Sequence, residues 1–231
     1  MNQRTMNTES RIRARRAAMF GLVAVGCLPS LASAFKLGDL GNALKGNSNA
    51  STNNDAGNGM SGENDSLVRG YNAANKDVLL ANSIMADALG LKDAAAASKA
   101  TAEALTDGAT KGNLQDANKA VSSSTEAVAA ELAKGPKLDD AAKAKFGKGA
   151  EKLAHGVQKY VALQGPVTQF STGLRSAPLT MLPRIQAGVY VVSQLPGGLS
   201  TAVRSLKQVV AFSKSNNIPV PPDATQAMAA L

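Results

Sequence analysis

The most regular apolar pattern in the chain is SLVRGYNAANKDVLLANSIMADALG, residues 66–90. Its apolar side chains recur at steps of three or four residues, the spacing that places them on one face of an α-helix. These side chains are Leu67, Tyr71, Ala74, Val78, Ala81, Met85 and Leu89. Asp65 or Ser66 is suited to cap the start of the helix, and Gly90 is suited to end it. The sequence therefore predicts a long amphipathic helix over residues 66–89.

Further helical patterns follow, separated by glycine and proline. They predict helices over residues 92–106, 113–134, 139–164, 168–176, 180–194 and 200–214, and a last helical turn from Asp223. The run Val189-Tyr190-Val191-Val192 is also compatible with a strand, but nothing else in the chain offers a pairing partner. We therefore expect it in a helix that is buried nearly all round. Because the connections are short, the prediction is an all-α, antiparallel bundle of about five to six helices.

Two of the expected helices, 92–106 and 113–134, have apolar stripes made largely of alanine. Alanine favours the helix but buries little apolar area. We expect these two helices to be the most loosely packed. In the helix over 139–164, Ala142, Gly149 and Gly156 recur at steps of seven. Such a row of small residues predicts a close approach by the backbone of another helix.

The N-terminal residues 1–34 have the layout of a cleaved export signal. Four arginines (Arg11, Arg13, Arg15, Arg16) precede an apolar run from Ala17 to Leu28, and Ala32-Ser33-Ala34 fits a signal-peptidase site. The run is about a dozen residues long, whereas a bilayer span needs roughly 20. We expect cleavage after Ala34 and a mature protein that begins at Phe35 in the periplasm or outside the cell.

Two alternatives for export stay open at this point. Cys27 lies in a loose lipoprotein-box context, although Ala24 stands where that box has a bulky aliphatic residue, so a lipid anchor through Cys27 is the alternative to cleavage after Ala34. The pair Arg15-Arg16 and the mild apolar core resemble a twin-arginine signal, and the general secretory route is the other possibility.

Residues 35–65 are predicted to precede the bundle as a tether. Leu37, Leu40 and Leu44 have helical spacing, which suggests a short amphipathic segment over residues 35–45. Residues 46–65 are rich in Asn, Gly and Ser, and Met60 is their only sizeable apolar side chain. Such a run buries too little surface to offset the entropy of ordering it, so we expect a flexible linker. The predicted organisation is thus 1–34 signal, 35–65 segment and linker, and 66–231 bundle.

Composition after cleavage excludes several classes of function. Residues 35–231 hold 20 Lys and Arg against 16 Asp and Glu, a net charge of +4 compared with +8 for the whole chain. That charge is too small for a dedicated nucleic-acid binder. Loss of Cys27 would remove disulfides, thiolate catalysis and cysteine-based metal sites. The scarcity of aromatic residues argues against sugar-binding platforms.

The most specific surface feature is a row of positive side chains in the helix over 139–164. Lys145, Lys148, Lys152, His155 and Lys159 recur at steps of three or four residues and share one face. His155 is the sole histidine, and no second His or Cys is present after cleavage to complete a metal or catalytic site. We therefore predict no metal, no cofactor and no enzymatic activity.

The predicted function is that of an accessory or interaction module of the cell envelope. The cationic row would bind an anionic membrane surface or an acidic region of a protein partner, although a row of lysines is also what a solvated helix face needs. The alternative function is a carrier or sensor of a small apolar ligand held in a cavity between helices. The sequence does not indicate the oligomeric state.

Overall fold

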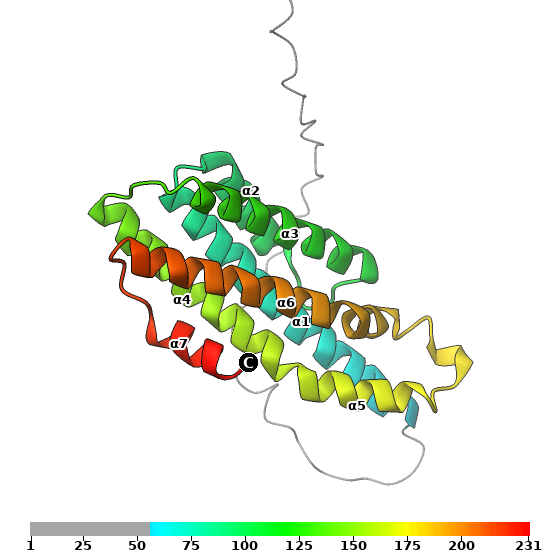
Figure 1. Cartoon of the computed structure of the whole chain (residues 1–231). Coiled ribbons are helices and arrows are strands. Elements are labelled where there is room, and N and C mark those ends of the chain that lie inside the picture. Colours follow the sequence, from blue (N-terminus) through cyan, green and yellow to red (C-terminus); the bar gives the residue numbers. More distant parts are fainter. Residues whose placement is uncertain (1–55) are drawn as a thin grey trace, which may run out of the picture. The chain divides into compact units, whose positions relative to one another are not determined.

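The computed structural model describes residues 56–231, and every regular element in this part of the chain is helical, which confirms the all-α class (Figure 1). The elements are α1 (Ala56–Ala88), α2 (Lys92–Ala104), α3 (Lys111–Ala133), α4 (Asp140–Ala162), α5 (Gln164–Leu174), the 3-10 turn η1 (Leu179–Met181), α6 (Gln186–Ser215) and α7 (Pro222–Ala229). The predictions for the signal, Cys27 and residues 35–45 lie outside the described residues. None of the helices over 56–231 is long and apolar enough to cross a bilayer.

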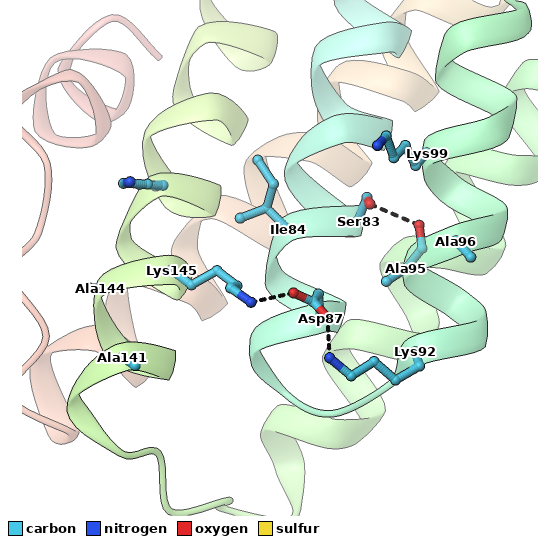
Figure 2. A pocket seen from close by; sticks show the side chains of 11 residues that line it. Ser83, Ile84, Asp87, Lys92, Ala95, Ala96, Lys99, Ala141, Ala144 and Lys145 are labelled. Atoms are coloured by element: carbon cyan, nitrogen blue, oxygen red, sulfur yellow. Dashed lines mark hydrogen bonds and ion pairs between the residues drawn. The ribbon is translucent and has the colours of Figure 1, made fainter.

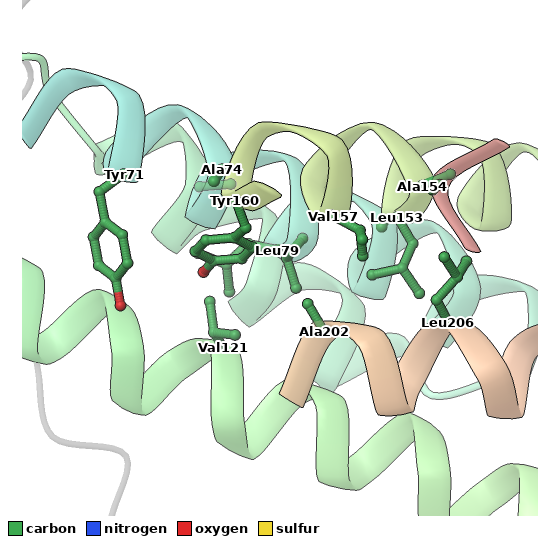
Figure 3. Close-up of a cluster of buried hydrophobic side chains, with 14 of the residues drawn as sticks. Tyr71, Ala74, Leu79, Val121, Leu153, Ala154, Val157, Tyr160, Ala202 and Leu206 are labelled. Carbon is green, nitrogen blue, oxygen red and sulfur yellow. The ribbon is translucent and has the colours of Figure 1, made fainter. Parts of the chain in front are cut away.

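Helix α1 is the centre of the bundle. It packs against α2, α3, α4, α5 and α6, while α7 packs on α4 and α6 (Figure 1). The apolar stripe predicted for α1 is buried from Leu67 to Met85, as expected for a helix covered on several sides. Figure 3 shows part of the resulting core, in which side chains of α1 and α4 meet Val121 of α3 and Ala202 and Leu206 of α6.

The start of α1 differs from the prediction. The helix begins at Ala56 rather than Ser66, so the linker expected over 46–65 is wrong for its last ten residues. Met60 is buried, with its Cε close to Gly173 of α5. Asn64 is also buried, and its side-chain oxygen accepts a hydrogen bond from the amide of Gly188 in α6 at 2.8 Å. These contacts offset the entropy cost that composition alone suggested would keep the segment unfolded.

Two of the three small residues predicted to share a row on α4, Gly149 and Gly156, face α1. A Cβ atom at Gly156 would lie 2.8 Å from Val78 Cγ2 and 3.3 Å from the Val78 backbone nitrogen. A Cβ at Gly149 would meet the Met85 side chain and would lie 3.2 Å from the Ala81 carbonyl oxygen. No larger residue fits such spaces without movement of a backbone. The prediction of a close helix approach is confirmed at these two glycines.

The opposite side of α1 meets α3 through polar side chains. Tyr71 Oη donates to Asn118 Oδ1 at 2.9 Å, Asn75 Nδ2 donates to the same oxygen at 3.2 Å, and Asn118 Nδ2 donates to Tyr190 Oη at 2.9 Å. Tyr160 of α4 donates to Asn75 Oδ1. Burial raises the pKa of the Tyr71 and Tyr160 hydroxyls well above the ordinary value, so both remain protonated donors at any physiological pH. The network ties α1, α3, α4 and α6 together.

Helix α6 is a second departure from the prediction. Residues 186–215 form one helix, although Pro196, Gly197 and Gly198 predict a turn between two shorter helices. Gly198 lies against the hydroxyl groups of Tyr71 and Tyr160, where a Cβ would be 3.3 Å and 3.5 Å from the two oxygens. Pro196 is on the exposed side, where solvent can reach the carbonyl left without a partner. Tertiary packing therefore stabilises a helix across residues that would end an isolated one.

Two further predictions need adjustment. Residues 189–192 are helical, as expected, but they are not buried all round, because Val189 is 38% exposed and α6 covers the bundle with only one of its sides. The helix expected to end at Gly165-Pro166 ends at Ala162 instead, and α5 begins at Gln164 with Pro166 in its first turn. A proline is tolerated there because its missing N–H has no partner within the helix.

Candidate functional site

The predicted cationic row lies along one side of α4, and four of its five members contact acidic side chains of the fold. Lys145 pairs with Asp87, Lys152 and Lys159 pair with Asp77, and His155 contacts Asp223. Lys148 has no salt-bridge partner within residues 56–231. The row therefore contributes to the packing of α4, and only part of it is available as a free charged surface.

The buried carboxylate of Asp77 on α1 determines where the side chains of Lys152 and Lys159 lie. Its side chain is only 7% exposed, and its two oxygens lie 3.0 Å from Lys152 Nζ and 2.7 Å from Lys159 Nζ. A carboxylate taken out of water is costly unless it is paired and hydrogen-bonded. The two lysines of α4 supply this compensation, which directs their amino groups toward α1 while both side chains stay partly exposed.

The other end of the row borders an open groove between α2 and α4, with α1 as its floor (Figure 2). Its volume is about 650 Å³. The groove is lined by Ser83, Ile84 and Asp87 of α1, by Lys92, Ala95, Ala96 and Lys99 of α2, and by Ala141, Ala144, Lys145 and Lys148 of α4. We call it the lysine-rimmed groove, because apolar and small side chains line it between four lysines.

The groove exists because α2 and α4 both pack on α1 without forming a packed interface with each other. Gly90, with φ +81°, lets the chain reverse after α1, and α2 then runs back along it. Ser83 Oγ donates to the Ala95 carbonyl at 2.8 Å and holds α2 in place. On the other side, Gly149 brings α4 close to α1. The alanines that line both walls leave the space between the helices unfilled.

One carboxylate lies among the four lysines of the groove. Asp87 accepts hydrogen bonds from Lys145 and, at 2.6 Å, from Lys92 (Figure 2). The hydrogen bond from Lys145, followed by that from Lys92, lowers the pKa of Asp87 to about 2. Lys99 has a long contact of 3.9 Å with Glu103, which does not line the groove. The lining side chains thus carry four positive charges against one negative charge.

A second hollow lies near the start of α6 and is smaller, about 260 Å³. Its lining consists of Lys111, Leu182, Gln186, Val189, Tyr190 and Ser193. The neighbouring turn exposes Leu179, which is 82% accessible to solvent. This surface is apolar but carries a single lysine, and nothing in the structure shows what covers it. The lysine-rimmed groove is the stronger candidate site because its charge selects a class of partner.

Sequence reasoning identified Lys145 and Lys148 but missed Lys92 and Lys99. The sequence does contain a pattern that could have identified Lys92 and Lys99, because two lysines seven residues apart on a helix lie on one face. Their convergence with the lysines of α4 depends on how both helices pack on α1, which no local pattern contains.

Comparisons with protein-family models, with curated proteins and with solved structures find no match to this chain. The candidate site therefore rests on its own geometry and charge.

Proposed function

We propose that this protein is an exported, non-catalytic interaction module that binds an acidic amphipathic helix of a partner protein in the lysine-rimmed groove. The observation that carries the proposal is the groove itself, in which four lysines border an alanine-lined channel with a single carboxylate between them. The occupant must be anionic, partly apolar and elongated.

The shape of the groove favours a helix as occupant. Its walls are two helices, its floor is a third, and Ala95, Ala96, Ala141 and Ala144 offer little side-chain bulk. A fourth helix can approach such a surface closely and contact Ile84 with an apolar side chain, as amphipathic helices do when they bind in grooves. The groove is open to solvent, so the far side of the bound helix would stay hydrated and could be polar.

The charge of the groove favours acidic residues at the edges of that helix. Lys148 has no acidic partner among the described residues, and Lys99 has only a distant one. An incoming carboxylate can pair with Lys148 without breaking a salt bridge, and with Lys99 at the cost only of its 3.9 Å contact with Glu103. Lys92 and Lys145 already share Asp87, so they add to the positive potential of the groove but are less free to pair with a second carboxylate.

The open form of the groove also supports this proposal over a carrier of small apolar ligands. A carrier encloses most of the surface of its ligand, whereas both hollows described above open to solvent. An anionic membrane also presents the negative charge that the lysines of the groove would attract. Its flat surface matches a groove between two helices less well than a helix does.

Export is a separate part of the proposal, supported by the basic, apolar and small-residue order of residues 11–34. Intact mass of the protein recovered from a periplasmic extract is expected to match a chain that begins at Phe35. An acylated mass beginning at Cys27 would place the protein on a membrane instead, and uncleaved protein in the cytoplasm would contradict export.

The groove is tested with a synthetic 18-residue helix that carries alanine and leucine on one face and glutamate at both edges of that face. We expect the peptide to bind the native protein, and its version with lysine in place of glutamate not to bind. The variant with Lys99→Glu and Lys148→Glu should bind the acidic peptide at least about tenfold more weakly, because two attractive charges become repulsive. Fluorescence anisotropy at low and high salt measures both effects.

The matched control reverses the charge of two exposed lysines outside the groove, Lys119→Glu and Lys207→Glu. It has the same net charge as the groove variant. This variant should bind the acidic peptide with only a small loss. Equal loss in both variants would show a nonspecific charge effect and would contradict the groove. Groove-dependent binding to phosphatidylglycerol vesicles, without binding to the peptide, would make the anionic membrane the partner and exclude the helix.

A further inference from the structure

We propose that Glu151, His155 and Asp223 form a binding site for a divalent transition-metal ion, with Zn²⁺ as the best match, which joins the C-terminal helix α7 to α4. The site is independent of the lysine-rimmed groove. One ligand atom from each of the three side chains lies within 4.8 Å of the others. The prediction from sequence was that His155 has no co-ligating partner. The fold supplies two carboxylates instead of a second histidine.

The geometry of the pair His155 and Asp223 fits tetrahedral coordination. Zinc binds imidazole nitrogen and carboxylate oxygen at about 2.0–2.1 Å, so two ligand atoms of a tetrahedral site are separated by roughly 3.3 Å. His155 Nε2 and Asp223 Oδ2 are 3.1 Å apart. An ion can therefore replace the shared proton with little movement of either side chain.

Glu151 completes the set from one helical turn before His155. Residues four apart on a helix project from the same face, which is the spacing that lets one helix provide two ligands to one ion. Glu151 is exposed, so its side chain can rotate toward the ion without repacking the core. A water molecule would complete the shell, because His155 and Asp223 are half-exposed.

The charges around the site point to a cation. Neither Glu151 nor Asp223 has a lysine or arginine partner within residues 56–231, although α4 carries several lysines. Lys152 and Lys159, three residues before and four residues after His155, pair with Asp77 on the α1 side, and Lys148, three residues before Glu151, forms no salt bridge with it. Two carboxylates therefore face a single imidazole with no positive side chain bound to either. A divalent cation would neutralise them.

Transition metals match this donor set better than magnesium or calcium. Imidazole is a preferred ligand of Zn²⁺ and Cu²⁺, whereas Mg²⁺ and Ca²⁺ take oxygen ligands in larger coordination shells. The consequence for the fold is local. Helix α7 has eight residues and buries only Ala224 and Ala227, so a metal bridge through Asp223 would hold its first turn on α4.

Because His155 is the sole histidine, its imidazole reports on the site without ambiguity. Protein without a histidine tag is titrated with ZnCl₂ and followed by calorimetry and by the ¹H–¹⁵N spectrum of the imidazole. We expect one ion to bind per chain, a shift of the His155 nitrogen signals, and slower amide exchange in α7. Magnesium at the same concentration should produce none of these changes.

The decisive variant is Glu151→Gln, because Glu151 has no hydrogen bond or salt bridge among the described contacts and its replacement should leave the fold intact. Zinc affinity should fall about tenfold or more, as it should in Asp223→Asn. The control Glu126→Gln removes an exposed carboxylate of α3 and should retain native affinity. Absence of heat and of an imidazole shift at 1 mM Zn²⁺, or equal affinity in Glu151→Gln and Glu126→Gln, would overturn the site.

Discussion

Helix α1 contacts its neighbours in two different ways. Toward α4, the interface is close, with Gly149 and Gly156 against the backbone of α1 and the rings of Tyr71 and Tyr160 in edge contact at 5.6 Å between centroids. It also carries the ion pairs of Asp77 with Lys152 and Lys159. Toward α2 and α3, α1 presents side-chain amides and hydroxyls. Asn82 Nδ2 donates to Ser124 Oγ and Thr125 Oγ1 at 2.9 Å each.

The difference follows from side-chain size. The buried residues of α2 are Ala95, Ser98 and Ala102, which offer too little apolar area to fix a helix by packing alone. Hydrogen bonds from α1 fix the orientation of α2, which buries too little apolar area to be fixed by packing. Each such bond adds only about 1 kcal/mol of net stability. The α1–α4 pair therefore combines close packing with ion pairs, and α2 depends more on hydrogen bonds. Helix α3 uses both, since its Leu114, Val121 and Val128 are buried in the core. The lysine-rimmed groove lies where these two kinds of packing meet.

The strongest test adds side-chain volume where α4 packs closely against α1. The double variant Gly149→Ala and Gly156→Ala is expected to lose about 3 kcal/mol of unfolding free energy, since overpacking against the α1 backbone exceeds the gain in helix propensity. Gly147→Ala is the control on the same helix, because its Cβ would have only one neighbour, Ile218 Cγ2 at 3.9 Å. It should be neutral or stabilising. Urea unfolding measures both, and a double variant as stable as the native protein would contradict the steric interface.

The next test removes the central amide of the polar side. Asn118→Ala leaves the buried hydroxyl of Tyr71 and the amide of Asn75 without their acceptor, which is expected to cost about 2 kcal/mol. Gln115→Ala, at an exposed position of the same helix, should change stability very little.

In the native protein, amide hydrogens of α2 and α3 should exchange faster than those of α1 and α6. Uniform protection across the four helices would show that the polar side is as firmly held as the steric side.

The smallest expected effect is the loss of the Asp87 ion pairs, at the edge of the lysine-rimmed groove, at acidic pH. The pKa of Asp87 is lowered in the folded protein, to about 2 from the usual 3.8, so its pairs with Lys145 and Lys92 stabilise the fold above about pH 4. That contribution should decline as the pH falls toward 2. The difference in unfolding free energy between the native protein and Asp87→Asn should therefore narrow over this interval. If the difference in unfolding free energy between the two proteins did not change with pH, the ion pairs of Asp87 with Lys145 and Lys92 would not stabilise the fold.

Local sequence patterns determined much of this fold. The steps of three and four from Leu67 to Met85 predicted the buried face of α1, because helix geometry alone places such residues together. The spacing of Gly149 and Gly156 likewise predicted a close helix contact, and Lys145 and Lys148 were identified from their place on one face of α4.

Other features depend on residues that are distant in the sequence, and only the tertiary structure decided them. The first turns of helix α1, from Ala56, are held by distant contacts, among them the hydrogen bond of Asn64 with Gly188, 124 positions away. Helix α6 continues through Pro196 because its residues pack on the tyrosines of α1 and α4. The groove joins lysines of α2 and α4, and the proposed metal site joins His155 to a carboxylate 68 positions later. Sequence spacing specifies which residues share a helix face, but which faces meet is decided by the free energy of the whole packed bundle.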